Sequence, residues 1–292
     1  MRATVGIQMW GRRFAVAAGA AALAVAGVGV ADATPAKTIT NYVALGDSYA
    51  AGTAILPMSG KGECGTSAIN YPSLVAKKLR IKNFTDVTCG GAKVADFTGR
   101  QGFPSPAPPQ FAALRKNTEL VTVGIGGNDI HLVELTASCI NPAATATSRQ
   151  CAPRPGGRDK VGATINAFGP KYDKVIAGVR ERSPKARILL VGYPYGIRPG
   201  GCPGRQPMGG PDATYIQDKI SQLNRVMKVR AEANGAEYVD IETPTKKHEA
   251  CSGSQSQMVG VLPTDTQSLT PLHPNAAGQR TMAATVLKTL EN

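Results

Sequence analysis

The sequence predicts an α/β protein in which one parallel sheet lies between two layers of helices. Short apolar runs rich in β-branched residues alternate with longer amphipathic segments, and no linker divides the chain after its first 33 residues. Strands that alternate with helices are joined by right-handed crossovers. Such crossovers build a doubly wound, three-layer α/β/α domain, whose functional residues follow the carboxyl ends of the strands.

Five segments are predicted to be strands. The strongest are the continuous apolar runs 41–45, 120–125 and 186–193, which are typical of parallel strands buried on both faces. Segments 84–89 and 236–241 are weaker examples of the same pattern.

Helical spacing of apolar residues predicts four helices, at 70–79, 172–183, 215–234 and 274–290. Pro274 suits the first turn of the last helix, where its missing N–H leaves no hydrogen bond unmade. Stretches rich in glycine and proline predict long surface loops at 99–109, 141–157 and 194–211.

Residues 1–33 resemble an export signal rather than part of the fold. Arg12 and Arg13 precede an uncharged run over 14–30, and Ala-Asp-Ala at 31–33 is a small-residue cleavage site. A membrane anchor is the alternative, but the run is short and poor in Leu, Ile and Phe. We therefore expect a signal peptide over 1–33, a single domain over 34–292, and a secreted protein.

Six cysteines lie in the predicted mature chain, and an even number in an exported protein indicates three disulfides. A zinc site is the alternative, but no tight Cys-x-x-Cys pair is present, so no metal or cofactor is expected. Sequential pairing, with each loop closed locally, is the simplest arrangement: Cys64–Cys89, Cys139–Cys151 and Cys202–Cys251.

The formal net charge is +13, and removal of three arginines and one aspartate with the leader leaves +11. The basic residues are scattered and no nucleic-acid-binding motif accompanies them, so nucleic acid is not an expected partner. Attraction to an anionic envelope or phospholipid surface is the bolder interpretation, and a solvated surface is the plainer one. A monomer is expected by default.

Chemically useful side chains follow the predicted strands. Ser48 follows the first strand in Gly-Asp-Ser, Gly91 follows the second in Cys-Gly-Gly, and Asn128 follows the third in Gly-Gly-Asn-Asp. His273 ends the last long loop, just before the C-terminal helix. We expect these four residues to meet at the carboxyl edge of the sheet.

Acyl transfer requires these residue types. A serine hydroxyl becomes a strong nucleophile when an imidazole takes its proton. The oxyanion of the tetrahedral intermediate needs preorganised donors, which the N–H groups of Ser48 and Gly91 and the Asn128 amide can supply. Glycine at position 91 keeps the backbone approach open.

The blocks "GDS", "CGGA", "GGND" and "LHPNAAG", in this order, resemble those of the SGNH hydrolases, also called GDSL esterases and lipases. The resemblance is nearest to the secreted bacterial branch with three disulfides, which includes lipases, esterases and phospholipase A1-like members. It implies a flavodoxin-like strand order of 2-1-3-4-5. It also implies that Ser48 is the nucleophile, that His273 is the general base, and that Gly91 and Asn128 are oxyanion donors.

One residue departs from the family pattern. Members commonly place an aspartate three residues before the histidine, to orient it, and this chain has Thr270 there. Some relatives use a backbone carbonyl instead, so we expect the Thr270 carbonyl to accept from His273 Nδ1. Asp265 is the less favoured orienter.

The function predicted is therefore a secreted serine esterase or lipase that acts on lipid or short-chain acyl esters. A carbohydrate O-deacetylase, or a catalytically inactive envelope-binding protein on the same fold, are the alternatives. Asp47 and Asp129 are interpreted as carboxylates that accept backbone N–H groups in their own turns. Tyr193 and Tyr195 are interpreted as packing residues, and His131 and His248 as structural or surface residues. A place in the wall of the substrate pocket is the alternative for His131.

Overall fold

A computed structural model describes residues 38–291 apart from 61, 103, 104, 204 and 262–267, together with residues 1, 3, 4, 6 and 9–11. Thr38–Asn292 forms one compact unit, separate from Met1–Lys37. Most of the predicted signal peptide lies outside the described residues, as does Asp265. Among the described residues, no helix is long and apolar enough to cross a membrane.

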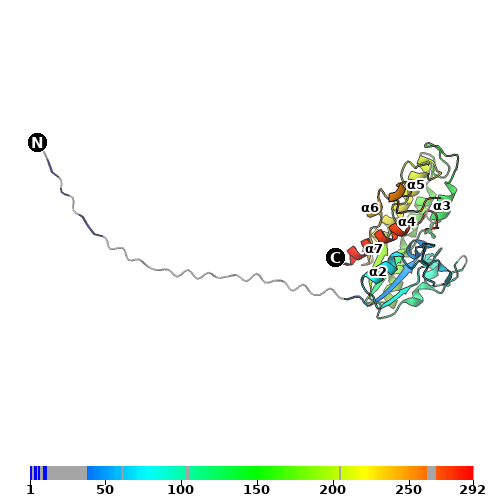
Figure 1. Ribbon diagram of the computed structural model, residues 1–292, viewed down its shortest axis with the longest axis horizontal. Helices are drawn as coiled ribbons and strands as arrows, with labels where there is room; N and C mark the ends of the chain where they lie inside the picture. Colours follow the sequence, from blue (N-terminus) through cyan, green and yellow to red (C-terminus); the bar gives the residue numbers. More distant parts are fainter. Residues whose placement is uncertain are drawn as a thin grey trace. The chain divides into compact units, whose positions relative to one another are not determined.

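Five parallel strands form one sheet in the order β2-β1-β3-β4-β5. Figure 1 labels six of the helices that accompany the sheet, α2 to α7. The strands are β1 (Asn41–Gly46), β2 (Asn83–Asp86), β3 (Leu120–Gly124), β4 (Arg187–Val191) and β5 (Glu237–Val239). The α/β class and the strand order are as predicted. Because β1 and β3 are neighbours in register, Gly46 lies opposite Gly124 where both strands end.

The described helices and single turns connect the strands. The α-helices are α1 (Ser48–Ala51), α2 (Tyr71–Lys78), α3 (Leu132–Ser138), α4 (Lys160–Arg182), α5 (Gly210–Ala233), α6 (Glu242–Thr245) and α7 (Ala276–Glu291). The 3₁₀ turns are Gly62–Cys64, Val94–Phe97, Gln110–Ala113 and Gly253–Gln255.

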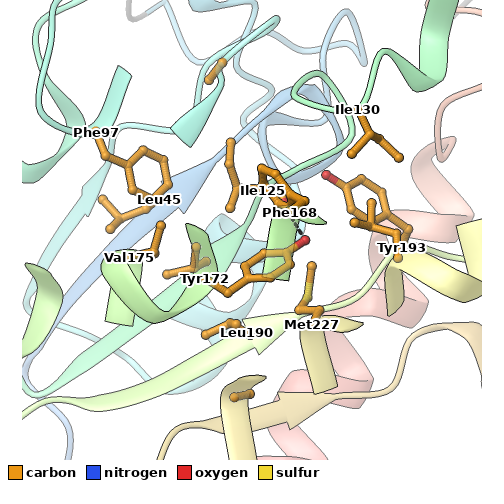
Figure 2. Packing of buried hydrophobic residues seen from close by; sticks show 14 of the residues in the cluster. Leu45, Phe97, Ile125, Ile130, Phe168, Tyr172, Val175, Leu190, Tyr193 and Met227 are labelled. Carbon is orange, nitrogen blue, oxygen red and sulfur yellow. Dashed lines mark hydrogen bonds between the residues drawn. The ribbon is translucent and has the colours of Figure 1, made fainter. Parts of the chain in front are cut away.

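The two faces of the sheet bury two separate apolar clusters. Alternate residues of a strand point to opposite faces, so Leu190 packs with α4 and α5, whereas Leu189 packs with α2 and α7. Figure 2 shows the first cluster, in which Tyr172 of α4 and Met227 of α5 lie beside Leu190. This arrangement is the expected three-layer sandwich.

Helix α4 begins twelve residues before the predicted start, and Pro170 lies inside it. Proline in a helix interior removes a hydrogen bond, which is why the sequence pattern indicated a later start. Here the Asp159 side chain caps the helix by accepting the Gly162 N–H, at 2.9 Å. Tyr215 of α5 donates to the same carboxylate at 2.7 Å, so packing between helices outweighs the local signal.

Helix α7 begins at Ala276, so the expectation that Pro274 lies in its first turn is wrong. The side chain of Asn275 accepts the N–H of Gly278 at 3.0 Å, which is the bond of an N-terminal cap. Pro274 instead lies before the cap, in the loop that carries His273, where it forms an isolated bridge with Met258.

Three disulfides join all six cysteines in the sequential arrangement. They tie together loops at the carboxyl edge of the sheet: Cys89 follows β2, Cys139 caps α3, and Cys202 follows β4. Each cross-link restricts the unfolded chain and stabilises the folded one, typically by about 2–4 kcal/mol. The loops that surround the predicted site are therefore covalently restrained.

Candidate active site

Ser48 begins α1, directly after β1. Asp47 caps this helix, since its carboxylate accepts the N–H of Tyr49 at 3.0 Å, and its own N–H donates to the Gly124 carbonyl at 2.9 Å. Gly46 has a φ of +152°, and a Cβ there would lie 2.5 Å from the Gly124 carbonyl oxygen. Only glycine lets β1 turn this close to β3, and the turn brings Ser48 to the edge of the sheet.

The hydroxyl of Ser48 lies 2.7 Å from Nε2 of His273, although 225 residues separate them. Both side chains are buried, with Ser48 9% and His273 7% exposed. Burial lowers the pKa of His273 from 6.5 to about 4. The imidazole is therefore neutral at neutral pH, with a lone pair on Nε2 that can accept the serine proton.

The carbonyl of Pro271, not that of Thr270, orients the imidazole. His273 Nδ1 donates to the Pro271 oxygen at 2.8 Å, so the expectation for Thr270 is wrong by one residue. Leu272 adopts a φ of +60°, which folds the chain back so that the carbonyl two residues before His273 faces the ring. Thr270 is held elsewhere, because its hydroxyl donates to the Thr53 carbonyl at 2.7 Å.

Tyr49 holds the histidine loop against the serine helix. Its hydroxyl donates to the Leu272 carbonyl at 2.7 Å, and its ring centroid lies 4.5 Å from that of His273. The backbone carbonyl of His273 accepts the N–H of Val259 at 2.8 Å. A role for Tyr49 was not predicted from the sequence, in which its position directly after Ser48 was the available signal.

Gly91 and Asn128 lie on neighbouring loops. The Asn128 amide donates to the carbonyl of Ala92 at 3.0 Å, which leaves its second N–H for another acceptor. Gly91 has a φ of +79°, a conformation that favours glycine. Within the described part of the chain, the N–H groups of Ser48 and Gly91 donate to no other residue.

Tyr193, interpreted from the sequence as a packing residue, bonds two of these loops. Its hydroxyl donates to Asp47 at 2.5 Å and accepts the N–H of Gly127 at 2.7 Å. Burial raises the pKa of Asp47 to about 7, although the hydrogen bonds from Tyr193 and Tyr49 oppose the shift. Asp47 therefore accepts a hydrogen bond from the loop after β4 as well as from its own turn.

The remaining candidates lie away from the serine and the imidazole. Asp129 accepts the N–H of Val94, at 3.1 Å, so it bonds another loop rather than its own turn. His131 is exposed and faces Glu134 at 3.4 Å, and His248 faces the Gln255 carbonyl at 2.9 Å. Neither histidine contacts Ser48.

An apolar pocket opens beside His273. Its lining comprises Tyr49, Leu132, Val133, Thr136, Tyr193, Pro194, Gly196, Ile197, Ile220, Met258, Pro271, Leu272 and His273. Carbon atoms make up most of this surface, so the pocket suits a hydrocarbon chain better than a sugar ring.

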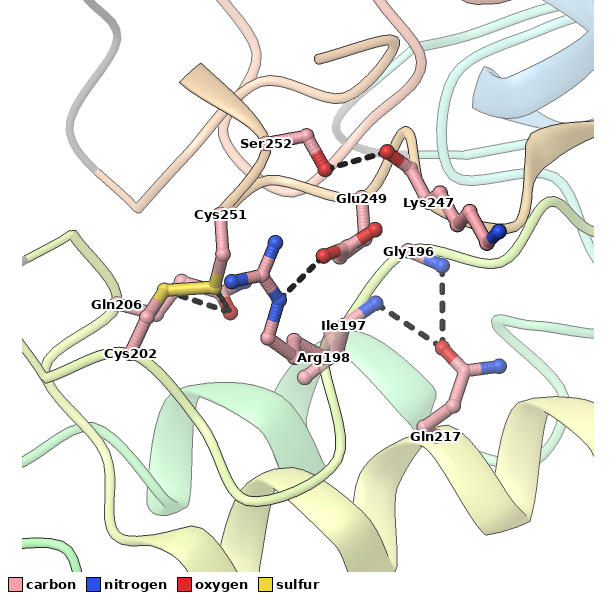
Figure 3. Close-up of polar contacts among 10 residues, drawn as sticks. All are labelled: Gly196, Ile197, Arg198, Cys202, Gln206, Gln217, Lys247, Glu249, Cys251 and Ser252. Carbon is pink, nitrogen blue, oxygen red and sulfur yellow. Dashed lines mark hydrogen bonds and ion pairs between the residues drawn. A yellow bond between two sulfur atoms is a disulfide. The ribbon is translucent and has the colours of Figure 1, made fainter. Parts of the chain in front are cut away.

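Gly196 and Ile197, which line this pocket, are held by polar groups (Figure 3). The side-chain oxygen of Gln217 accepts the N–H groups of Gly196 and Ile197, at 3.1 and 3.0 Å. Arg198 pairs with the buried Glu249, and the Cys202–Cys251 disulfide lies beside this pair. The backbone of this part of the lining is thus held in place by a side chain of α5.

Comparison with known proteins identifies the family to which this chain belongs. Residues 44–281 match the model of the GDSL-like Lipase/Acylhydrolase family. Lipase 2 of Streptomyces coelicolor is 36% identical over 277 residues, which cover 90% of this chain and 92% of that protein.

Solved structures of Streptomyces enzymes are also similar to this chain. Phospholipase A1 from Streptomyces albidoflavus superposes with a TM-score of 0.67 and 29% identity, over 86% of this chain and 99% of that one. The extracellular lipase of Streptomyces rimosus has a TM-score of 0.67 and 26% identity, over the same shares of the two chains. This chain therefore belongs to the GDSL-like lipase/acylhydrolase family, the SGNH hydrolases, and is a carboxylic ester hydrolase.

Proposed function

We propose that the chain is a secreted serine esterase that cleaves acyl esters through a covalent acyl-Ser48 intermediate. The observation that carries this proposal is the 2.7 Å contact between Ser48 Oγ and His273 Nε2 beside an apolar pocket. Secretion is supported by the leader pattern over 1–33 and by the three disulfides.

In the first half-reaction, His273 takes the proton of Ser48 as Oγ attacks the ester carbonyl carbon. The tetrahedral intermediate collapses when the protonated imidazole gives its proton to the leaving alkoxide. Water then attacks the acyl-serine with His273 again as base, and the acid leaves. In each half-reaction the imidazole takes up one proton and gives it away, first to the leaving alkoxide and then to Ser48 Oγ as the acyl–oxygen bond breaks, so the cycle closes.

The oxyanion is assigned to three donors: the N–H groups of Ser48 and Gly91 and the side-chain amide of Asn128. Support comes from the two backbone N–H groups, which have no other acceptor among the described residues, and from the second N–H of Asn128. These donors are fixed before substrate binds, so little reorganisation opposes the development of charge.

The pocket beside His273 is assigned to the acyl chain. Its apolar lining favours lipid or short-chain acyl esters over acetylated sugar, which supports the esterase over the O-deacetylase. The positive net charge supports association with anionic phospholipid surfaces. We propose a monomer as the acting unit.

Fluorophosphonate labelling tests the proposal, because these probes phosphonylate only an activated serine. Wild-type protein is expected to incorporate one equivalent and Ser48→Ala none. Ser138→Ala, which alters an exposed serine on α3, is the matched control and should label like wild type. Equal labelling of Ser48→Ala, or none of wild type, would reject the serine esterase.

Asp265→Asn is expected to leave kcat within about twofold of wild type, since the Pro271 carbonyl already accepts from Nδ1. A neutral acceptor fixes the tautomer of the imidazole without adding a charge to it. Steady-state kinetics on a p-nitrophenyl ester check this. A loss on the order of 10³-fold or more, comparable to removal of a triad aspartate, would return the orienting role to Asp265.

A further inference from the structure

We propose that Tyr193 is a positioning residue, whose hydroxyl bridges Asp47 and Gly127 and thereby sets the distance between the nucleophile and the oxyanion donor Asn128. This inference rests on the proposed function and extends it to a residue that makes no contact with Ser48. Tyr193 follows β4, so it reaches the ends of β3 and β1 from the neighbouring strand.

The bridge consists of two hydrogen bonds at one oxygen. The phenol donates to Asp47 Oδ2 at 2.5 Å and accepts the Gly127 N–H at 2.7 Å. Asp47 immediately precedes Ser48, and Gly127 immediately precedes Asn128. One buried oxygen atom therefore connects the two segments whose next residues carry out the proposed chemistry.

The surroundings leave this bridge little freedom to move. Tyr193 is 2% exposed, and its own N–H is fixed to Asn224 at 2.8 Å. A Cβ on Gly127 would lie 3.2 Å from the phenol oxygen, so the loop is packed directly against it. The ring also packs edge-on against Tyr49, with centroids 5.1 Å apart.

The bridge matters most in the transition state. Substrate binding depends on the apolar pocket, whereas the Asn128 amide must meet an oxyanion that exists only after attack. A small displacement of a preorganised donor therefore lowers kcat and leaves KM nearly unchanged. A residue that only filled space would instead lower the fraction of folded, active protein.

Tyr193→Phe removes the bridge and keeps the ring. We expect kcat per fluorophosphonate-titrated site to fall about ten- to a hundredfold on a p-nitrophenyl ester, with KM within about twofold. In an Asn128→Ala background, the same substitution should lower kcat by less than about threefold, because the donor that Tyr193 positions is already absent.

Tyr172→Phe is the matched control. Tyr172 is also buried, and its hydroxyl donates to the Ile125 carbonyl at 2.9 Å, in the same loop, but it makes no hydrogen bond with Asp47 or Gly127 among the described residues. It should lower the melting temperature and keep kcat within about threefold. Three results would overturn the positioning role. They are a wild-type kcat in Tyr193→Phe, an equal loss of kcat in Tyr172→Phe, and losses of kcat that are fully additive when Tyr193→Phe is combined with Asn128→Ala. Failure of wild type to label would instead reject the proposed function.

Discussion

Ser48→Ala and His273→Gln are each expected to lower kcat by a factor on the order of 10⁴–10⁶, because neither group acts without the other. Without the hydroxyl there is no nucleophile, and without the imidazole the hydroxyl keeps its proton. The double variant should therefore be no slower than either single variant. Steady-state kinetics on a soluble ester, normalised to folded protein by circular dichroism, measure all three.

Additive losses in the double variant would contradict a shared step and would separate the two residues. A His273→Gln enzyme with more than about a tenth of wild-type kcat would remove the imidazole from the mechanism. Ser252→Ala is a suitable control, since Ser252 Oγ donates to the Lys247 carbonyl, at 2.7 Å, and makes no hydrogen bond with Ser48 or His273 among the described residues.

The buried imidazole also predicts a pH profile. Burial lowers the pKa of His273 to about 4, so the imidazole remains a neutral base well below pH 6.5. We therefore expect kcat/KM to fall only as the pH approaches about 4. The unfolded state binds the proton more tightly than the folded state between pH 6.5 and 4. Stability from the neutral imidazole is therefore present above pH 6.5 and is lost as the pH falls through this range.

Thermal melts from pH 7 to pH 4 test whether the stability of the folded protein falls as the pH falls. Wild type should lose more stability over this range than His273→Gln, which has no proton to take up. An acid limb of kcat/KM centred at pH 6.5 or above would show that the imidazole is not desolvated as the structure has it.

Asn128→Ala is expected to lower kcat about a hundred- to a thousandfold, with KM nearly unchanged, because the amide acts on the oxyanion and not on the bound ester. Asn128→Asp should be slower still, since a carboxylate at this position repels the developing negative charge. Both variants should bind a non-hydrolysable ester analogue as wild type does.

The Asn128 amide also donates to the Ala92 carbonyl, at 3.0 Å, so a structural effect has to be separated from a catalytic one. The melting temperatures of the two variants separate these effects, because a structural effect lowers the melting temperature and a purely catalytic one does not. Asn166→Ala, on the exposed face of α4, is the control. A rise in KM with unchanged kcat would assign Asn128 to substrate binding alone.

The motifs and the alternation of strands and helices were enough to predict much of this protein. Buried parallel strands have continuous apolar sequences, so their number and type could be predicted directly. Helix α4 could not be delimited, because Pro170 and the neighbouring glycines indicate a break that contact with α5 overrides.

A backbone carbonyl was correctly predicted as the partner of His273 Nδ1, but the carbonyl belongs to Pro271 and not to Thr270. A carbonyl was expected because Thr270 stands where the family has an aspartate. Which carbonyl faces Nδ1 depends on the left-handed turn at Leu272, and nothing in a leucine side chain indicates a positive φ. The bond from Thr270 to Thr53 is likewise a contact between distant loops.

The sequence by itself determined the fold class, the strand order by resemblance, and the serine, histidine, glycine and asparagine of the proposed site. Local residue types and their order along the chain carry that information. Only the tertiary structure decided that Pro271 faces the imidazole and that Tyr193 joins Asp47 to Gly127. The first contact depends on the left-handed conformation of Leu272. The second arises where β1, β3 and β4 end side by side, and the spacing of residues along a chain does not encode the distances between strand ends.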